Sequence, residues 1–284
     1  MTIKEVYAEF LAELKGLYNA GEAAAITNII FDYFGGMSST AVITNANNEL
    51  DNHLVKLLQN ALMQIKKHVP VQYITGKAWF YNVSFKVNKN VLIPRAETEE
   101  LVLEAINFLK ENEGKKVIDI GTGSGCIPIS IKKNISEADV TAIDVSKEAL
   151  AVAKNNALSN NVKIKFLELD FLDENNYGDL PKFDLIISNP PSIPENEKKS
   201  LDKNVKDYEP HLALFVPDND PLLFYKKILV FAENHLKING KILLETHEDF
   251  AKQTAAIFIA NKYEVEIKKD MQDKERMLLI YHYP

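Results

Sequence analysis

A glycine-rich loop near the middle of the chain holds the first residues whose types and spacing suit chemistry. Its members, here called the glycine loop, are Gly121, Thr122, Gly123, Ser124 and Gly125. An apolar segment, residues 116–120, leads into it, and glycines at this spacing let the backbone turn tightly against a ligand. Asp144 follows 19 residues after Gly125, which suits hydrogen bonds to two ribose hydroxyls. The pattern predicts a nucleoside-bearing cofactor, in preference to a plain structural turn.

The glycine spacing indicates which cofactor to expect. A dinucleotide site has the pattern G-x-G-x-x-G and sets a helix N-terminus against a pyrophosphate, whereas this loop has G-x-G-x-G. Asp119 stands just before the loop, where its charge would repel a pyrophosphate but attract the sulfonium or ammonium group of S-adenosylmethionine. We therefore expect S-adenosylmethionine as cofactor and S-adenosylhomocysteine as its product.

Asp170 and Phe171 extend this site. They follow another apolar segment, residues 163–167. An aspartate in that place is commonly a cap or turn residue. The position of the pair in order along the predicted sheet favours a cofactor contact, in which Asp170 accepts from the adenine amino group and Phe171 covers the ring face.

The second group of interest is Asn189, Pro190 and Pro191, here called the NPP loop. It follows the apolar segment 183–187, and doubly wound sheets bind ligands at the carboxyl ends of their strands. The prolines hold the loop extended and leave carbonyl groups free to accept, while the Asn189 side chain both donates and accepts. Such a loop can grip a planar NH2 group, of an amide or a base, beside a methyl donor. Methyl transfer needs in-line proximity and desolvation more than a strong base.

Strands and helices alternate from about residue 98 onward. The predicted strands are 116–120, 138–143, 163–167, 183–187, 240–244, 263–267 and 276–282, and the main helices are 101–109 and 222–236. Nearly all-apolar strands between helices indicate an α/β fold with a doubly wound parallel sheet, and the last two strands suggest an antiparallel edge.

The N-terminal region has a different pattern. Apolar residues recur at helical spacing, and the recurring positions are Val6, Phe10, Leu11, Leu14, Ile26, Ile29, Ile30, Tyr33, Leu54, Leu57, Leu58, Ala61, Leu62 and Ile65. Alternating residues from Trp79 to Val87 predict a hairpin. We expect a helical domain over residues 1–73, a β-hairpin linker over 74–95 and a catalytic domain over 96–284. The helical domain is either a plain bundle or a module that recognises a protein substrate.

Composition narrows the class of protein. The 284 residues are 46% hydrophobic and 26% charged, as in soluble proteins of one or two domains. The single cysteine, Cys126, permits no internal disulfide and favours a reducing cytoplasm. No apolar run approaches the roughly 20 residues of a membrane span, and the net charge of -7 disfavours direct nucleic-acid binding. We expect a cytoplasmic monomer without a metal site or membrane contact.

The two loops and their surroundings resemble a known enzyme family. The order D-x-G-T-G-S-G, an acidic strand end and N-P-P is similar to that of class I, Rossmann-like amino methyltransferases. The chain resembles more specifically the HemK/PrmC family, which methylates the side-chain amide of a glutamine in peptide chain release factors. The matching stretches are residues 72–76, 91–99, 121–125, 189–191 and 208–214. The I-P-R-x-x-T-E and Y-E-P segments discriminate this family from DNA adenine methyltransferases, which share the N-P-P loop.

The resemblance implies a role for each site residue. The glycine loop would line the cofactor, Asp144 would hold its ribose, and Phe171 would lie against adenine. Asn189 and the Pro190 carbonyl would bind the glutamine amide, and release factors would be the protein partners.

Two positions near the implied acceptor pocket leave alternatives open. Arg95 is expected near the mouth of the site, or else in an ion pair with Glu97 or Glu99. Ser192 stands where the family has tyrosine, and it supplies neither the area nor the π face of an aromatic ring. Three interpretations of Ser192 are open. Another aromatic residue fills the space of the tyrosine ring, or the enzyme is slow or altered in its acceptor, or the sequence is an engineered variant of a parent with tyrosine. The aromatic replacements considered are Phe80, Tyr81 and Phe215.

Three rival functions share these motifs. A glutamine methyltransferase acting on a ribosomal protein would use the same chemistry. A nucleic-acid adenine N6-methyltransferase is disfavoured by the net charge and by the lack of a Lys/Arg-rich module in residues 1–70. A non-catalytic S-adenosylmethionine-binding protein has Ser192 as its only support.

Overall fold

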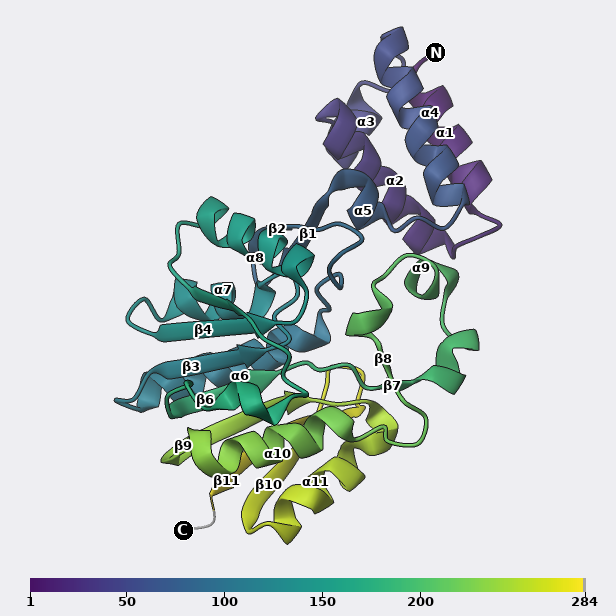
Figure 1. Cartoon of the computed structure of the whole chain (residues 1–284). Helices are drawn as coiled ribbons and strands as arrows, with labels where there is room; N and C mark the ends of the chain where they lie inside the picture. Colours follow the sequence, from purple (N-terminus) through teal and green to yellow (C-terminus); the bar gives the residue numbers. More distant parts are fainter. Residues whose placement is uncertain (283–284) are drawn as a thin grey trace. The chain divides into compact units, whose positions relative to one another are not determined.

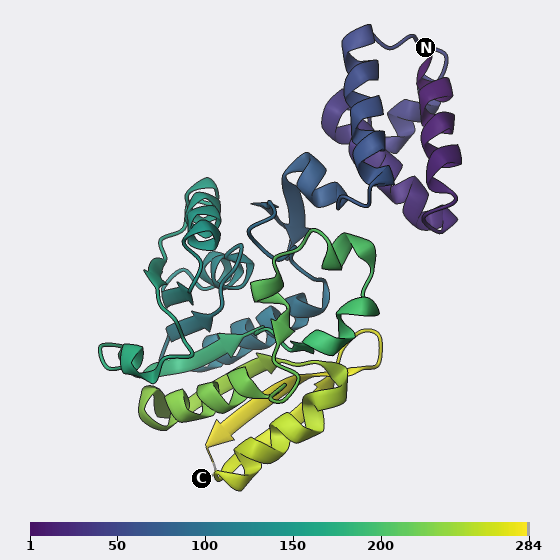
Figure 2. The same ribbon diagram turned by 45° about the vertical axis from the view of Figure 1, so that its right-hand side comes forward.

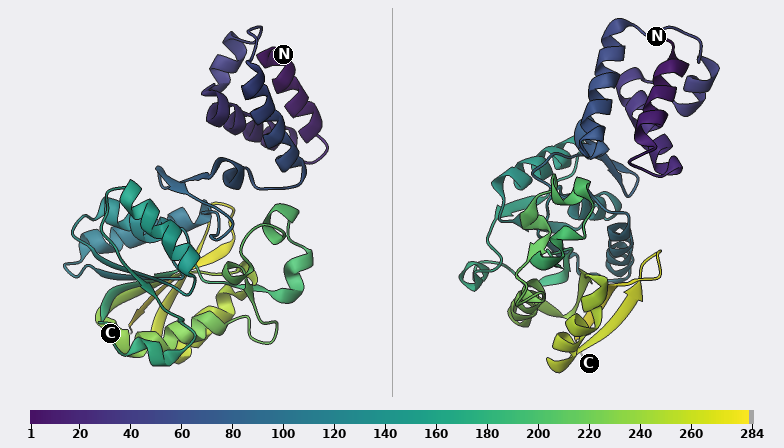
Figure 3. Two further views of the ribbon diagram at one scale, coloured as in Figure 1. Left: turned by 45° about the horizontal axis from the view of Figure 1, so that its top comes forward. Right: turned by 90° about the vertical axis from the view of Figure 1, so that its right-hand side faces the viewer.

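A seven-stranded sheet forms the centre of the larger part of the chain (Figure 1). In the computed structural model, which describes residues 1–282, the strand order is β10-β11-β9-β6-β3-β4-β5. The strands are β3 (Lys116–Ile120), β4 (Asp139–Asp144), β5 (Lys165–Glu168), β6 (Phe183–Ser188), β9 (Leu236–Glu245), β10 (Tyr263–Lys269) and β11 (Glu275–His282). Strands β9, β6, β3, β4 and β5 run parallel, whereas β11 pairs antiparallel with β9 and β10. The predicted α/β sheet with an antiparallel edge is confirmed, and Figure 3 shows this edge in yellow.

The path of the chain through the sheet places the site residues together. The chain runs outward from β3 through β4 to β5 and then returns to β6 on the other side of β3. Ligands of doubly wound sheets bind outside the carboxyl ends of the strands where the order reverses in this way. The predicted site residues follow β3, β4, β5 and β6, so they meet at this edge.

Alternate residues of the central strands face two different cores. Ile118 and Ile186 belong to one cluster, and Val117 and Leu185 belong to the other. This alternation follows from the two-residue period of a strand that is covered on both faces. The covering helices are α10 (Leu223–His235) and α11 (Ala251–Ala260) on the first side, and α6 (Glu97–Glu111), α7 (Cys126–Asn134) and α8 (Lys147–Ser159) on the second (Figure 1).

A smaller helical unit comprises Met1–Lys77 together with Asp202–Tyr208. Its helices are α1 (Ile3–Leu14), α2 (Ala20–Gly35), α3 (Ser39–Thr44), α4 (Asn52–Lys66), α5 (Val71–Thr75) and α9 (Lys203–Lys206), and Figure 2 shows α1 to α5 in purple and blue. Side chains of Thr2, Asn19, Ser38 and Asp51 cap the first four helices.

The buried face of α2 differs from the predicted one. Ile26 and Ile30 are buried as expected, but Ile29 and Tyr33 are exposed. Thr27 and Phe31 are buried instead. The Phe31 ring packs edge-on against Phe10 and Tyr7, so tertiary packing rotates the buried face away from the stripe that hydropathy favours.

The predicted hairpin is present with short strands, β1 (Lys77–Phe80) and β2 (Val83–Lys86). Tyr81 and Asn82 form its turn with φ of 48° and 58°, and asparagine tolerates this left-handed conformation better than most residues. Phe80 and Phe85 pack into the core beside α6, while Trp79 is 74% exposed.

Two regions depart from the predicted elements. Strand β9 begins at Leu236, directly after α10, and not at residue 240. A Cβ at Gly240 would lie 2.6 Å from the Leu236 side chain, so this glycine permits close packing and does not mark a strand start. Residues 193–216 also contain elements not predicted: β7 (Ile193–Pro194), η2 (Glu195–Lys199), η3 (His211–Ala213) and β8 (Phe215–Val216); the remaining short helices are η1 (Glu174–Tyr177) and η4 (Glu248–Phe250).

Within residues 1–282, each helix is too short or too polar to cross a membrane.

Candidate active site

A cavity of about 280 Å³ opens at the carboxyl ends of β3, β4, β5 and β6. Eight of the residues predicted from the sequence line it: Gly121, Gly123, Asp144, Asp170, Phe171, Asn189, Pro190 and Pro191. Six others do not: Asp119, Thr122, Ser124, Gly125, Ser192 and Arg95. The cavity therefore unites the glycine loop, the ends of the next two strands and the NPP loop.

Glycine is required at the three positions of the loop for different structural reasons. Gly121 and Gly123 have φ of 76° and 53°, and no atom lies within 4 Å of the place that a Cβ would occupy. Both therefore expose backbone to open space in a conformation that other residues rarely adopt. At Gly125 a Cβ would lie 3.1 Å from Ala153 of α8 and 3.1 Å from Ile129 of α7. Gly125 is required by packing behind the loop.

The N–H groups of the loop are largely bound within the protein. Those of Gly121 and Thr122 both donate to the Ile143 carbonyl at 3.0 Å, and that of Gly125 donates to Thr122. The Gly123 N–H donates to Asp144 Oδ2 at 2.8 Å. A pyrophosphate-binding loop would present such donors to its ligand. The geometry of the loop therefore agrees with the glycine spacing, which disfavours a dinucleotide as the ligand.

Asp144 ends β4 and faces the cavity with its carboxylate fixed from behind. Oδ2 accepts from Gly123, and Oδ1 accepts from the Ser146 N–H at 2.9 Å. Burial raises the pKa of Asp144 and these backbone hydrogen bonds oppose the shift. A carboxylate has about four acceptor positions, so two remain for hydroxyl groups of a ligand.

Asp119 is fully buried in β3, immediately behind the loop. In the part of the chain that the structure describes, neither of its oxygens has a hydrogen-bond partner. Burial raises the pKa of Asp119 from 3.8 to about 7; the nearby Thr122 hydroxyl opposes this shift and Asp144 adds to it. A buried carboxylate without a partner is costly to the apo protein, and a cation brought into the cavity would reduce that cost.

The far end of the cavity is apolar. Phe171 lines it and packs against Tyr177 and Phe231, with ring centroids 5.1 and 5.5 Å away. Asp170 is exposed and accepts from the Leu172 N–H at 2.9 Å, so it also serves the turn. Phe224 of α10 joins the lining and was not predicted, because its helix carries no motif.

A hydrogen-bonded chain behind the NPP loop holds the Asn189 side chain. Its Nδ2 donates to Thr98 Oγ1 at 3.1 Å, and that hydroxyl donates to Glu245 Oε2 at 2.6 Å. The Ser188 hydroxyl donates to the Ile120 carbonyl at 2.6 Å, which ties the end of β6 to the end of β3. Sequence reasoning did not assign a role to Thr98 or Glu245. Thr98 stands inside the I-P-R-x-x-T-E segment, but Glu245 carries no such signal.

Ser192 lies directly after the loop, and its N–H donates to the Leu214 carbonyl at 3.2 Å. Burial raises the pKa of Tyr225, while a hydrogen bond with the Ser192 side chain opposes that shift. The three aromatic replacements considered from the sequence do not line the cavity. Phe80 lies in the core, Tyr81 forms the hairpin turn, and Phe215 packs against His211. The aromatic rings that do line it are Phe171 and Phe224.

Arg95 forms an ion pair with Glu209, and the predicted alternative of a pair with Glu97 or Glu99 is wrong. Glu209 is only 4% exposed, and its other oxygen accepts from the Ile93 N–H at 3.0 Å. One buried carboxylate thus ties the I-P-R segment to the Y-E-P segment. Their shared function in the fold is to fix the loops beside the cavity.

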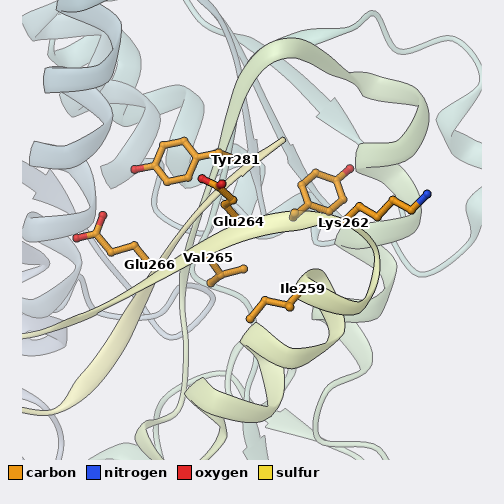
Figure 4. Close-up of a pocket in the computed structure, with 7 residues that line it drawn as sticks. Ile259, Lys262, Glu264, Val265, Glu266 and Tyr281 are labelled. Carbon is orange, nitrogen blue, oxygen red and sulfur yellow. The ribbon is translucent and has the colours of Figure 1, made fainter. Parts of the chain in front are cut away.

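A second hollow lies on the outer edge strand of the sheet, away from all of these loops. It is lined by Ile259, Lys262, Tyr263, Glu264, Val265, Glu266 and Tyr281. Figure 4 shows Ile259 on the helix α11 and Glu264, Val265 and Glu266 along the strand β10. It contains none of the predicted site residues. No cluster of metal-binding side chains occurs among residues 1–282.

The sheet order and the cavity at its switch point define a class I methyltransferase fold. A methyltransferase from Pyrococcus furiosus has the same fold, with a TM-score of 0.50 and 20% identity over 78% of this chain and 96% of its own. A family model described as the methyltransferase small domain matches residues 100–206, and one described as the PrmC N-terminal domain matches residues 5–76.

The chain belongs to the release factor glutamine methyltransferase family. The protein of that name from Flavobacterium psychrophilum is 40% identical over 289 residues and covers 99% of both chains. The one from Bacteroides thetaiotaomicron is 35% identical, covering 97% of this chain and 99% of its own. The resemblance inferred from the sequence motifs is confirmed.

Asp119→Asn should stabilise the cofactor-free protein at pH 8 more than at pH 5. Because the folded-state pKa is raised from 3.8 to about 7, the wild-type loses stability as pH rises through this interval. The asparagine variant does not, and the difference reaches at most roughly 4 kcal/mol above pH 7. Urea denaturation at both pH values measures it, and an equal difference at both would show that the pKa of Asp119 is not raised in the folded protein.

Proposed function

We propose that this protein transfers the methyl group of S-adenosylmethionine to the side-chain amide nitrogen of a glutamine in peptide chain release factors. The observation that carries the proposal is a single cavity that unites the glycine loop, Asp144 and the NPP loop. Membership of the family supports the choice of acceptor. The same membership favours release factors over ribosomal proteins or DNA as the substrate.

The residues of the cavity fit S-adenosylmethionine. Asp144 would bind the ribose hydroxyls through its two unused acceptor positions, and Gly121 and Gly123 would let the cofactor lie against the backbone. Asp119, buried without a partner behind the loop, supplies negative charge for the cationic methionine end. Phe171 and Phe224 provide an apolar surface for the adenine. When bound, the cofactor supplies an electrophilic methyl group on a positively charged sulfur.

The NPP loop would orient the acceptor amide. Asn189 Nδ2 is engaged by Thr98, so Oδ1 is the group left to accept an N–H of the glutamine. The Pro190 carbonyl would accept the second N–H, and the two contacts fix the amide plane. Holding the nitrogen in line with the methyl group, away from water, supplies most of the rate acceleration such a reaction needs. After transfer the nitrogen carries one proton more than the product amide, and it loses that proton to water as the product leaves the site.

The helical unit is proposed to recognise the protein substrate. Its match to the PrmC N-terminal domain supports this role. We propose residues 1–73 as the recognition domain, 74–95 as the hairpin linker and 96–284 as the methyltransferase domain.

Asn189→Ala should lower kcat on a release factor by at least about 100-fold, because it removes the acceptor that orients the amide. The assay uses radiolabelled cofactor and measures label on the release factor. Asn261→Ala is the matched control: Asn261 is exposed at the end of α11, and its side-chain NH2 group donates to the Ile257 carbonyl of the same helix. Its activity should equal that of the wild-type.

The same assay separates the rival functions. Label that disappears when the target glutamine is changed supports the proposal. Label on a ribosomal protein or on DNA, with none on release factor, would refute it. Cofactor binding without label on any of the three would identify a non-catalytic binding protein.

Ser192→Tyr should raise turnover on a release factor, because an aromatic ring adds a flat apolar wall beside the acceptor amide. Ser192→Ala is the control, since it removes the hydroxyl near Tyr225 without adding a ring. Turnover of the tyrosine variant at or below the wild-type value would contradict the idea that the missing ring limits the enzyme.

A further inference from the structure

The hydrogen-bonded chain Asn189–Thr98–Glu245 has a direction. An ionised carboxylate has no proton to donate, so the Thr98 hydroxyl must donate to Glu245 Oε2, at 2.6 Å. The lone pairs of Thr98 Oγ1 are then left to accept from Asn189 Nδ2, at 3.1 Å. The charge on Glu245 therefore decides which end of the Asn189 amide faces Thr98.

This direction excludes the alternative orientation of Asn189. If the Asn189 amide were flipped so that Oδ1 and Nδ2 exchanged places, Oδ1 would lie against Thr98 Oγ1. The only proton of that hydroxyl is already donated to Glu245. Two acceptors would then face each other in a buried site, since Thr98 is 3% exposed. The observed orientation turns Oδ1, and not the NH2 group, away from Thr98.

We propose that Thr98 and Glu245 are positioning residues that fix Asn189 with Oδ1 toward the acceptor and strengthen that oxygen as a hydrogen-bond acceptor. The inference rests on the proposed function for its consequence in catalysis. An oriented Oδ1 accepts from an amide NH2 but repels a carboxylate, so the chain also selects glutamine over glutamate. Linked hydrogen bonds that end on a charge polarise each member of the chain.

The surroundings of Glu245 make its charge sensitive to pH. The pKa of Glu245 is raised to about 7: burial is the main cause and Glu97 contributes, while Thr98, Arg276 and Arg95 oppose the shift. The Tyr225 hydroxyl reaches the Glu245 backbone carbonyl at 3.2 Å, and Cys126 is near enough to be affected by its charge. The carboxylate is ionised above about pH 7 and protonated below it, so the direction of the chain is enforced above that pH.

Thr98→Val should lower kcat on release factor by about 10- to 100-fold, as loss of a supporting hydrogen bond commonly does. The KM for the release factor and the Kd for the cofactor should stay within about twofold of the wild-type values, because Thr98 does not line the cavity. Thr98→Ser keeps the hydroxyl and should restore most of the activity. Thr254→Val is the matched control, a buried threonine of α11 whose hydroxyl has no partner among the described residues.

The deciding experiment observes the chain without any substrate. In the cofactor-free protein, the side-chain NH2 resonances of Asn189, assigned with Asn189→Ala, should titrate with an apparent pKa of about 7. The titration should vanish in Glu245→Gln and in Thr98→Val and persist in Thr254→Val. Resonances of folded wild-type protein that do not change between pH 5.5 and 8.5 would overturn the inference. If they titrate but no release factor is labelled, the positioning stands and the proposed function fails.

Discussion

The pairing of β3 with β4 on one side and β6 on the other is the constraint on which the site depends. It sets Asp119 opposite Ala142 and Ile187, and so brings the ends of three strands into register. Main-chain and side-chain bonds beyond the strands lock this register, from Gly121 to Ile143 and from Ser188 to Ile120. The glycine loop and the NPP loop are thereby held at neighbouring strand ends, on a core buried on both faces.

The carboxylates in and around the cavity are stabilised in unequal ways. Glu209 has an arginine and a backbone N–H, and Asp144 has two backbone N–H groups. Glu245 has a hydroxyl, and Asp119 has no hydrogen bond within the described chain. Glu209 fixes the loops beside the cavity, which is a structural task, whereas Asp144 lines the cavity and keeps acceptor positions for a ligand. Glu245 and Asp119 have pKa values raised to about 7, which is common where charge is kept for function.

The parts of the fold and site that could be predicted from the sequence are those with local patterns. Apolar strand segments, the glycine spacing and the NPP loop gave the sheet and the cavity because each is encoded by a few adjacent residues. The Thr98–Glu245 contact joins residues 147 apart in sequence, and the Glu209 tie to Ile93 joins residues 116 apart. Neither contact follows from a periodicity or a residue spacing in the sequence. The burial of Phe31 in place of Ile29 likewise depends on partners in other helices.

The glycine loop satisfies its own backbone before any ligand arrives. A loop whose N–H groups already bind Ile143, Asp144 and Thr122 has little conformational freedom left to lose. Association then carries no cost for ordering that backbone. Exchange of spent cofactor for fresh therefore does not have to wait for this segment to fold and unfold in each catalytic cycle.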